Sequence, residues 1–301
     1  GYTADSVSSM STWGYATSIA MLIVALAAPF LGVFGDIRGM RKKLFSFFML
    51  LGVAACAGMA FTPGMDFTSG PVAAGKVASL ILVLYIVSVI GFDASAIYYD
   101  AFLTDVTTED RMDKVSTMGY GLGYIGGSTI PLLIFLIMNL VGVPMLTCLA
   151  FVFGLTAVWW LAFSLPLLKN CEQTSGKPYE KGDVARSIKG VGTTIKEIIA
   201  NKPMLIYILS YFFYIDGVHT VISMATTYGT NLGLDSTGMM LALLLVQILG
   251  LPFCLLYIKC SEKFGARTMV GFGICVYMFI CIFAFFMNSL WQFWVLAVLC
   301  A

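Results

Sequence analysis

Residues 32–43 read GVFGDIRGMRKK and form a short charged stretch between two apolar runs. The flanking runs cover residues 13–34 and 44–61, close to the roughly 20 apolar residues that a helix needs to span a membrane. The stretch itself is basic, with Arg38, Arg41, Lys42 and Lys43. This arrangement predicts two antiparallel membrane helices joined by a tight, positively charged turn.

The composition of the whole chain agrees with a membrane protein. It is 59% apolar and only 11% charged, against about 25% charged in an average soluble domain. The net charge of +1 gives no basic field that would favour nucleic acid. The eight cysteines include no C-x-x-C pair, so we expect no disulfide framework and no metal site, and we expect no cofactor.

Further apolar runs predict spans at 77–102, 115–139, 144–166, 203–228, 237–258 and 269–287, and another that begins near Leu290. Threaded as alternating spans, they place all but Lys76 of the seventeen Lys and Arg residues on one side of the bilayer. Cytoplasmic loops carry an excess of Lys and Arg, so that side is predicted to be cytoplasmic. Residues 1–12 are then expected outside, with an odd number of spans, most simply one, before Gly1 if the N-terminus of the protein is cytoplasmic.

Both ends of the sequence look like cuts in a longer protein. The first residue is Gly1 rather than Met, and Ala301 lies inside an apolar run. No positively charged segment precedes the first apolar run, so that run is not expected to be a signal peptide.

The long loop at 167–202 suggests a division of the chain. We expect a helix bundle at 1–168, a cytoplasmic linker at 169–202 and a second bundle at 203–301. Apolar residues in the linker recur at spacings of three and four, which predicts an amphipathic helix in the membrane interface; they are Val184, Ile188, Val191, Ile195 and Ile198. The alternative is a solvated linker, because Gly190 and Gly192 weaken a helix.

An internal repeat supports a division of the chain into two halves. Asp36, Gly39 and Arg41 in the first charged turn have the same spacing as Glu262, Gly265 and Arg267 after the run at 237–258. Transporters built from two parallel bundles carry repeats of this kind. The second copy is degenerate, because Ile258 stands where Gly32 stands in the first.

Asp216 is the sharpest single candidate for a functional side chain. It lies near the middle of the run 203–228, where an ionised acid costs about 2.5–3.5 kcal/mol on insertion scales and where no Lys or Arg is present to offset it. His219 follows on the same helical face, and histidine exchanges protons near neutral pH. The pair could couple transport to a proton or a cation, or could instead be a structural pair that joins two helices.

Other polar residues inside the runs are weaker candidates. Asp93 lies deep in the third run, and Gln247 lies in the middle of the run 237–258. Gln247 could bind a polar substrate or act as an interhelical hydrogen-bonding group. Tyr124 and Tyr214 could line a cavity or simply pack.

Glycines at 119, 123 and 127 recur every four residues in the fourth predicted span. Small residues at this spacing favour close helix packing. The overlapping pattern GLGYIG at 121–126 fits a dinucleotide fingerprint on paper, but no strand precedes it, so we exclude that interpretation.

The basic turn resembles the helix 2–3 signature of the major facilitator superfamily, with every fixed position of the motif present: Gly32, Asp36, Gly39, Arg41 and Lys42. Three further stretches resemble the vacuole effluxer-like family: YYDAFLTD at 98–105, GYGLGYIGG at 119–127 and YIDGVHT at 214–220. The chain departs from that family in lacking its first helix, and Asp100 stands where Asn is commoner.

This resemblance implies an all-α integral membrane protein with two pseudo-symmetric bundles. About nine spans would run from helix 2 into helix 10 of twelve, with helices 2–6 in the first bundle and helices 7–10 in the second. It also implies a cytoplasmic gate in which Asp36 pairs with Arg41 and faces a helix N-terminus of the other half. Glu262, Gly265 and Arg267 would be its second copy.

The leading interpretation is a secondary transporter that moves a small polar metabolite by alternating access, with a proton or cation as candidate coupling ion. Amino acids are the substrate class that the resemblance implies, because the fungal vacuolar member is linked to their export. A non-transporting receptor or scaffold and a membrane-embedded enzyme are the alternatives; a single His and unpaired acids argue against an enzyme. The expected location is a bacterial cytoplasmic membrane, or a vacuolar membrane in a eukaryote. The sequence sets no oligomeric state.

Overall fold

The computed structural model describes residues 6–65, 69–176, 178 and 183–301, and in these ranges the chain is helical and has no strand. Long helices alternate with short turns, as an apolar chain that must satisfy its backbone hydrogen bonds within lipid requires. The α-helices are α1 (Ser6–Gly35), α2 (Met40–Phe61), α3 (Pro71–Ala101), α4 (Leu103–Val106), α5 (Met112–Gly123), α6 (Ile130–Leu140), α7 (Met145–Asn170), α8 (Asp183–Ala200), α9 (Lys202–Asn231), α10 (Ser236–Phe264), α11 (Ala266–Phe285) and α12 (Leu290–Cys300). Short turns η1 (Thr62–Gly64) and η2 (Glu109–Arg111) and a π-helical turn, η3 (Tyr124–Thr129), complete the described structure.

Every predicted span falls on a described helical segment. Eight described helical segments are long and apolar enough to cross a membrane, and α12 is a shorter apolar helix. The prediction of an all-helical membrane protein is therefore confirmed. Some helices extend beyond their apolar runs at both ends, as α1 and α10 do, since polar residues can also continue a helix. The run 115–139 forms α5, η3 and α6 together.

The linker contains the predicted helix, α8. Its backbone is helical throughout, although the side chains up to residue 189, including Val184 and Ile188, lie outside the described part. Within the rest of α8, Ile195 is exposed and Ile198 is half-buried. Its position in the membrane interface stays a prediction.

The chain divides into two compact units. The first contains residues 1–112 and 137–194, and the second contains residues 113–136 and 195–301. This division differs from the predicted bundle at 1–168, because the segment 113–136 packs against α10 rather than against the helices before it. The predicted bundle boundary at the linker stays a prediction.

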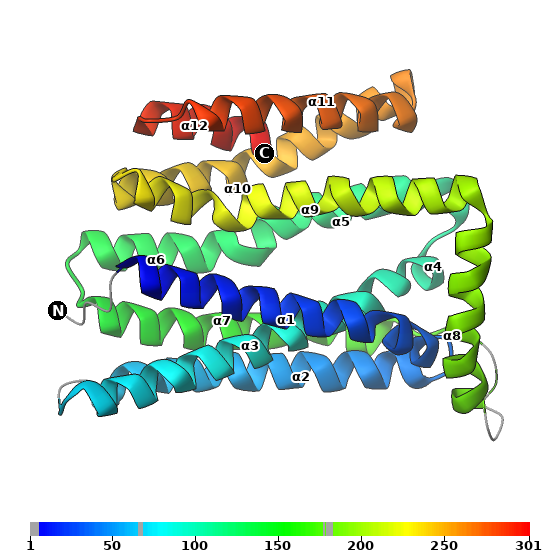
Figure 1. Ribbon diagram of the computed structural model, residues 1–301, viewed down its shortest axis with the longest axis horizontal. Coiled ribbons are helices and arrows are strands. Elements are labelled where there is room, and N and C mark those ends of the chain that lie inside the picture. The colour runs from blue at the N-terminus through cyan, green and yellow to red at the C-terminus, as the bar shows by residue number, and fades with distance from the viewer. Residues whose placement is uncertain (1–5, 66–68, 177, 179–182) are drawn as a thin grey trace. The chain divides into compact units, whose positions relative to one another are not determined.

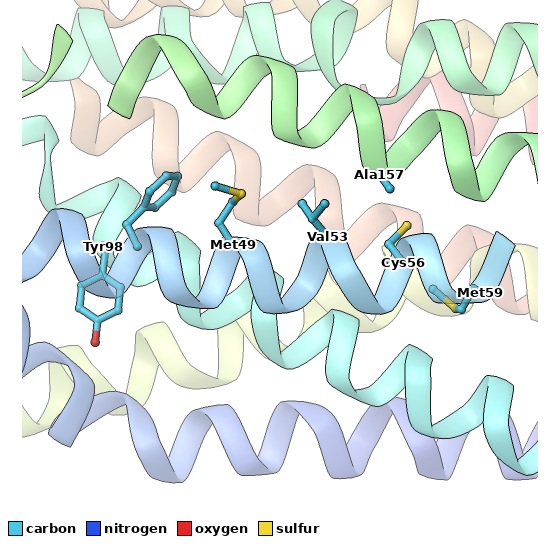
Figure 2. Packing of buried hydrophobic residues seen from close by; sticks show 7 residues of the cluster. Met49, Val53, Cys56, Met59, Tyr98 and Ala157 are labelled. Atoms are coloured by element: carbon cyan, nitrogen blue, oxygen red, sulfur yellow. The ribbon is translucent and has the colours of Figure 1, made fainter. Parts of the chain in front are cut away.

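The core of the first unit forms around α2, which contacts α3 and α7 (Figure 1). Figure 2 shows Met49, Val53 and Cys56 on the side of α2 that faces α7, where Ala157 meets them. These α2 residues recur at spacings of three and four, which gives one apolar stripe along the helix. Tyr98 of α3 is 1% exposed and donates a hydrogen bond from its hydroxyl to the carbonyl of Leu31 in α1 at 3.0 Å. The stripe and this tyrosine join α1, α2, α3 and α7.

Glycine permits the closest crossing in this unit. A Cβ atom at Gly91 of α3 would lie 2.5 Å from the backbone nitrogen of Gly52 and 2.7 Å from the carbonyl oxygen of Phe48. Both atoms belong to the backbone of α2, so they cannot rotate away. The two helices can approach this closely only because residue 91 has no side chain.

The second unit is organised around α10, which contacts α11, α12 and η3 (Figure 1). Its buried cluster comes from α10, α11, α12 and the turn before α12: Met239, Ala242, Ile280, Met287, Phe293, Leu296 and Ala297. The ring of Tyr124 in η3 occupies the space that a side chain at Gly250 would fill. Gly121 is the buried glycine of α5 and lies against α10, whereas a Cβ atom at Gly123 or Gly127 would meet nothing within 4 Å. The predicted glycine stripe is therefore wrong at those two positions.

Candidate functional site

The charged turn at residues 36–39 connects α1 to α2. Helix α1 ends at Gly35, and α2 begins at Met40 after Gly39, which has φ 81° and ψ −2°. This left-handed conformation suits glycine because it has no Cβ atom. The turn is closed by backbone hydrogen bonds from Ile37 to Phe34 at 3.3 Å and from Met40 to Ile37 at 3.0 Å. The signature glycine at position 39 therefore shapes the turn that separates the two helices.

Arg41 forms a buried ion pair with Asp105, which lies in the short helix α4 after α3. The side chain of Arg41 is 6% exposed and that of Asp105 is 0% exposed. The guanidinium group also donates from Nη1 to the carbonyl of Ala101 at 2.9 Å. Its carbon Cζ lies 5.7 Å from the ring centroid of Phe102, within the range of a cation–π interaction. The pair ties the start of α2 to the end of α3.

The partner of Arg41 differs from the one that the superfamily pattern implies. Asp36 is exposed and makes no side-chain hydrogen bond or ion pair with the described residues. The reason lies in helix periodicity: Arg41 is four residues before Phe45 and eight before Met49, so all three lie on the buried face of α2. Asp36 lies on the other side of Gly39, outside that face. The expected Asp36–Arg41 pair is therefore absent from this arrangement.

Asp105 is also held by the chain that follows α7. Its Oδ1 atom accepts hydrogen bonds from the backbone nitrogens of Thr174 at 3.1 Å and Ser175 at 2.9 Å. The two hydroxyl groups donate to the same oxygen at 2.9 and 2.8 Å. Hydrogen bonds to a carboxylate are stronger than neutral ones. One oxygen of Asp105 thus faces Arg41, while the other anchors the linker.

One donor of Arg41 is left over. Its Nε atom is buried and has no hydrogen-bond partner in the described structure. An unsatisfied buried donor costs about 1–3 kcal/mol. The ion pair therefore does not use the full hydrogen-bonding capacity of the guanidinium group.

The second copy of the motif also places a glycine of positive φ between two helices, but it has no ion pair with the described residues. Gly265 lies between α10 and α11 with φ 83°, the same sign as Gly39, although its ψ of 145° differs. Glu262 and Arg267 are exposed, and neither forms an ion pair with any described residue. Of the two turns, only the first carries a buried charge pair. Gly32 and Lys42, the remaining motif positions, lie at the end of α1 and the start of α2.

The predicted central pair is not covered by neighbouring helices. Asp216 and His219 are both exposed on α9, and within the described residues their side chains contact no hydrogen-bonding partner. The reason is that α9 contacts α10 and α11 only sparsely, and its most apolar window has no buried residue. A bare ionisable pair in the middle of a span is still unusual, because such residues are costly in lipid.

The other candidates fall in both units. In the second, Tyr214 packs edge-on against Tyr277 of α11, with ring centroids 6.4 Å apart and planes at 83°. Tyr124 is half-buried against Gly250, and Gln247 is half-buried three residues before that glycine. Asp93 is half-buried in α3 of the first unit. The structure brings Tyr124 to the same stretch of α10 as Gln247, and it does not assemble all the candidates into one site.

The sequence did not single out three residues of the network around Arg41: Asp105, Thr174 and Ser175. One signal was available for Asp105, since a carboxylate at the basic end of a span is a natural partner for a motif arginine. No pattern marks the two hydroxyl residues. Among the described residues, no group of three or more His, Cys, Asp or Glu side chains lies close enough together to hold a metal ion.

The helices and the charged turn define a class of protein: a multi-span, all-helical membrane protein of major facilitator type. The chain belongs to the family described as vacuole effluxer Atg22 like, whose model matches residues 3–301. It is similar to the uncharacterized MFS-type transporter YxiO of Bacillus subtilis (strain 168), with 40% identity over 294 residues, 96% of this chain and 66% of that protein. The chain thus spans about two thirds of the length of this relative.

More distant relatives come from fungi. Autophagy-related protein 22-1 of Penicillium rubens is 24% identical over 177 residues, 55% of this chain and 30% of that protein. Autophagy-related protein 22-1 of Aspergillus niger is 24% identical over 176 residues, 55% of this chain and 28% of that protein. No solved structure matches the chain significantly. The predicted family and an integral membrane location are confirmed.

Proposed function

We propose that this chain is part of a secondary transporter that moves a small polar metabolite by alternating access. The observation that carries the proposal is the buried Arg41–Asp105 pair at the superfamily turn. Membership of the Atg22-like family supports it. In this proposal the pair belongs to the cytoplasmic gate, and it separates when the solute is released to or taken from the cytoplasm.

The unused Nε donor of Arg41 fits a gate with two arrangements. If every N–H group of Arg41 were bonded in this arrangement, no donor would be left for a second acceptor. Here a second acceptor can bind the guanidinium group when Asp105 leaves, and Asp36, exposed beyond the same turn, is our candidate. Two alternative carboxylates for one arginine give a switch between discrete states.

The finer parts of the proposal concern substrate and coupling. We propose amino acids as the substrate class, on the strength of the family resemblance. Asp216 and His219 are the proposed coupling pair, because an ionisable residue in a span marks an ion or proton pathway by default. Asp93, Gln247, Tyr214 and Tyr124 are the proposed polar lining of the substrate path.

The test is transport by the full-length protein in proteoliposomes, with a mixture of ³H-labelled amino acids as probe. Arg41→Ala should reduce uptake to a small fraction of the wild-type rate. Arg38→Ala is the matched control, since Arg38 belongs to the same turn but is exposed. Equal uptake by both variants would refute the gate, and no uptake of any labelled amino acid by the wild type would refute the substrate class.

A further inference from the structure

The segment after α7 contacts the charged turn between α1 and α2 as well as Asp105. Gln173 places its side-chain oxygen Oε1 2.8 Å from the backbone nitrogen of Gly39 and 3.3 Å from that of Arg41. Its Nε2 atom donates to the carbonyl of Gly35 at 3.0 Å. One side chain therefore bridges the last residue of α1 and the first turn of α2.

This bridge supplies a helix cap that the turn itself lacks. The first backbone N–H groups of a helix have no partner within it, and a Ser, Thr, Asp or Asn side chain at the N-cap commonly accepts from one of them. The N-cap of α2 is Gly39, which has no side chain and makes no such bond. Gln173 provides the missing acceptor from another part of the chain. The glycine that shapes the turn thus makes the turn dependent on Gln173.

Gly176 lies close against the backbone of the charged turn. It has φ 120°, and a Cβ atom there would lie 2.7 Å from the carbonyl oxygen of Asp36 and 3.3 Å from the backbone nitrogen of Arg38. Both the backbone conformation and the contact require glycine. Residues 173–176 therefore lie directly on the charged turn, and Thr174 and Ser175 hold the Asp105 side of the ion pair.

We propose that residues 173–176 are a latch that keeps the cytoplasmic gate closed and must leave before the gate opens. This inference rests on the proposed function, since it assigns a regulator to that gate. The latch holds both partners of the ion pair: Gln173 fixes the backbone of Arg41, and Thr174 with Ser175 fixes the carboxylate of Asp105. Opening the gate requires the release of one of these attachments.

The chemistry of the latch suits reversible release. The contacts given above are hydrogen bonds and close backbone approaches, and no described residue of the core cluster around α2 comes from the latch. Water can replace each hydrogen bond when the latch leaves, so no apolar surface must be exposed. The chain continues from the latch through α8 into α9.

The first experiment is backbone amide hydrogen exchange of the full-length protein, comparing wild type with Gln173→Ala. Loss of the cap should speed exchange at Gly39 and Arg41 by about fivefold, the effect of a typical lost N-cap. If the latch holds the gate, exchange should also rise at residues 102–106, which Gln173 does not touch. A purely local cap would change only the first two positions.

Two further variants separate the latch from a general folding defect. Gln173→Glu keeps an oxygen acceptor for both N–H groups, so it should restore most of the protection at Gly39 and Arg41. Glu172→Ala changes the exposed neighbouring residue and should leave exchange unchanged. Unaltered exchange in residues 45–59, the core of α2, verifies the fold of every variant.

The outcomes are distinct. Faster exchange at both the turn and residues 102–106 supports the latch. Unchanged exchange at the turn, or faster exchange confined to it, overturns the latch while leaving the transport proposal intact. The proposed transport function is refuted only if the wild-type protein moves no solute in proteoliposomes. The exchange experiment does not depend on that result.

Discussion

The Arg41–Asp105 pair predicts strong energetic coupling between two residues that are 64 positions apart in the chain. We consider three full-length variants: Arg41→Met, Asp105→Asn and the double mutant. Methionine keeps the length of the arginine stem without its charge, and asparagine keeps an oxygen for Thr174 and Ser175. Each single change leaves one buried charge without its partner.

The burial of the pair sets the magnitude. With side chains 6% and 0% exposed, removal of one partner should cost about 3–5 kcal/mol, because the remaining charge stays desolvated. The lower end applies here, since Asp105 keeps its linker donors and Arg41 keeps the carbonyl of Ala101. A cost of about 3 kcal/mol corresponds to an open-to-closed ratio raised by about 100-fold.

Amide exchange at residues 102–106 measures that ratio directly when opening and closing are fast relative to chemical exchange. Each single variant should exchange about 100-fold faster than wild type in this segment. The double mutant has no uncompensated charge, so its effect should fall short of the sum of the two by about 1–3 kcal/mol.

A second ion pair in the same unit provides the control. Arg111 and Asp110 are 3.9 Å apart, and their side chains are 76% and 77% exposed. An equivalent cycle on this exposed pair should show no measurable coupling. If the Arg41–Asp105 effects were additive to within about 0.5 kcal/mol, the two residues would not act as a pair and the gate would lose its basis.

Three further predictions follow from single positions. Asp36→Asn should slow the exchange between conformational states with little effect on substrate affinity, because Asp36 is exposed at the turn; equal loss of affinity in a binding assay would contradict this. Asp216→Asn should abolish uptake driven by an imposed pH gradient in proteoliposomes, because asparagine cannot exchange a proton in the middle of α9; retained gradient-driven uptake would make Asp216 structural. Gly91→Ala should destabilise the protein by at least about 1–3 kcal/mol, because the new Cβ atom would lie 2.5 Å from the backbone of Gly52. Gly75→Ala, on the same helix with nothing within 4 Å, should raise the midpoint of thermal unfolding slightly because alanine favours a helix, and similar midpoints for both variants would refute the packing argument.

The membrane helices were predictable because their cause is local. An apolar run of sufficient length spans a bilayer whatever its neighbours do, and all the predicted runs became helices. The charged turn was predictable for the same reason, since Gly39 and the basic residues around it act within a few positions. The predicted fold class, family and membrane location needed no tertiary contact.

The partners of the polar residues could not be predicted, because they depend on how distant segments pack. The sequence places Asp36 nearest to Arg41, yet the burial of one face of α2 directs Arg41 toward Asp105 instead. It offers no pattern by which Gln173, well over a hundred positions away, could be recognised as the cap of α2. It also could not show that Asp216 is left uncovered, since exposure depends on which helices contact α9. Length and polarity of a segment determine whether it becomes a helix, but only the packed structure determines which donor meets which acceptor.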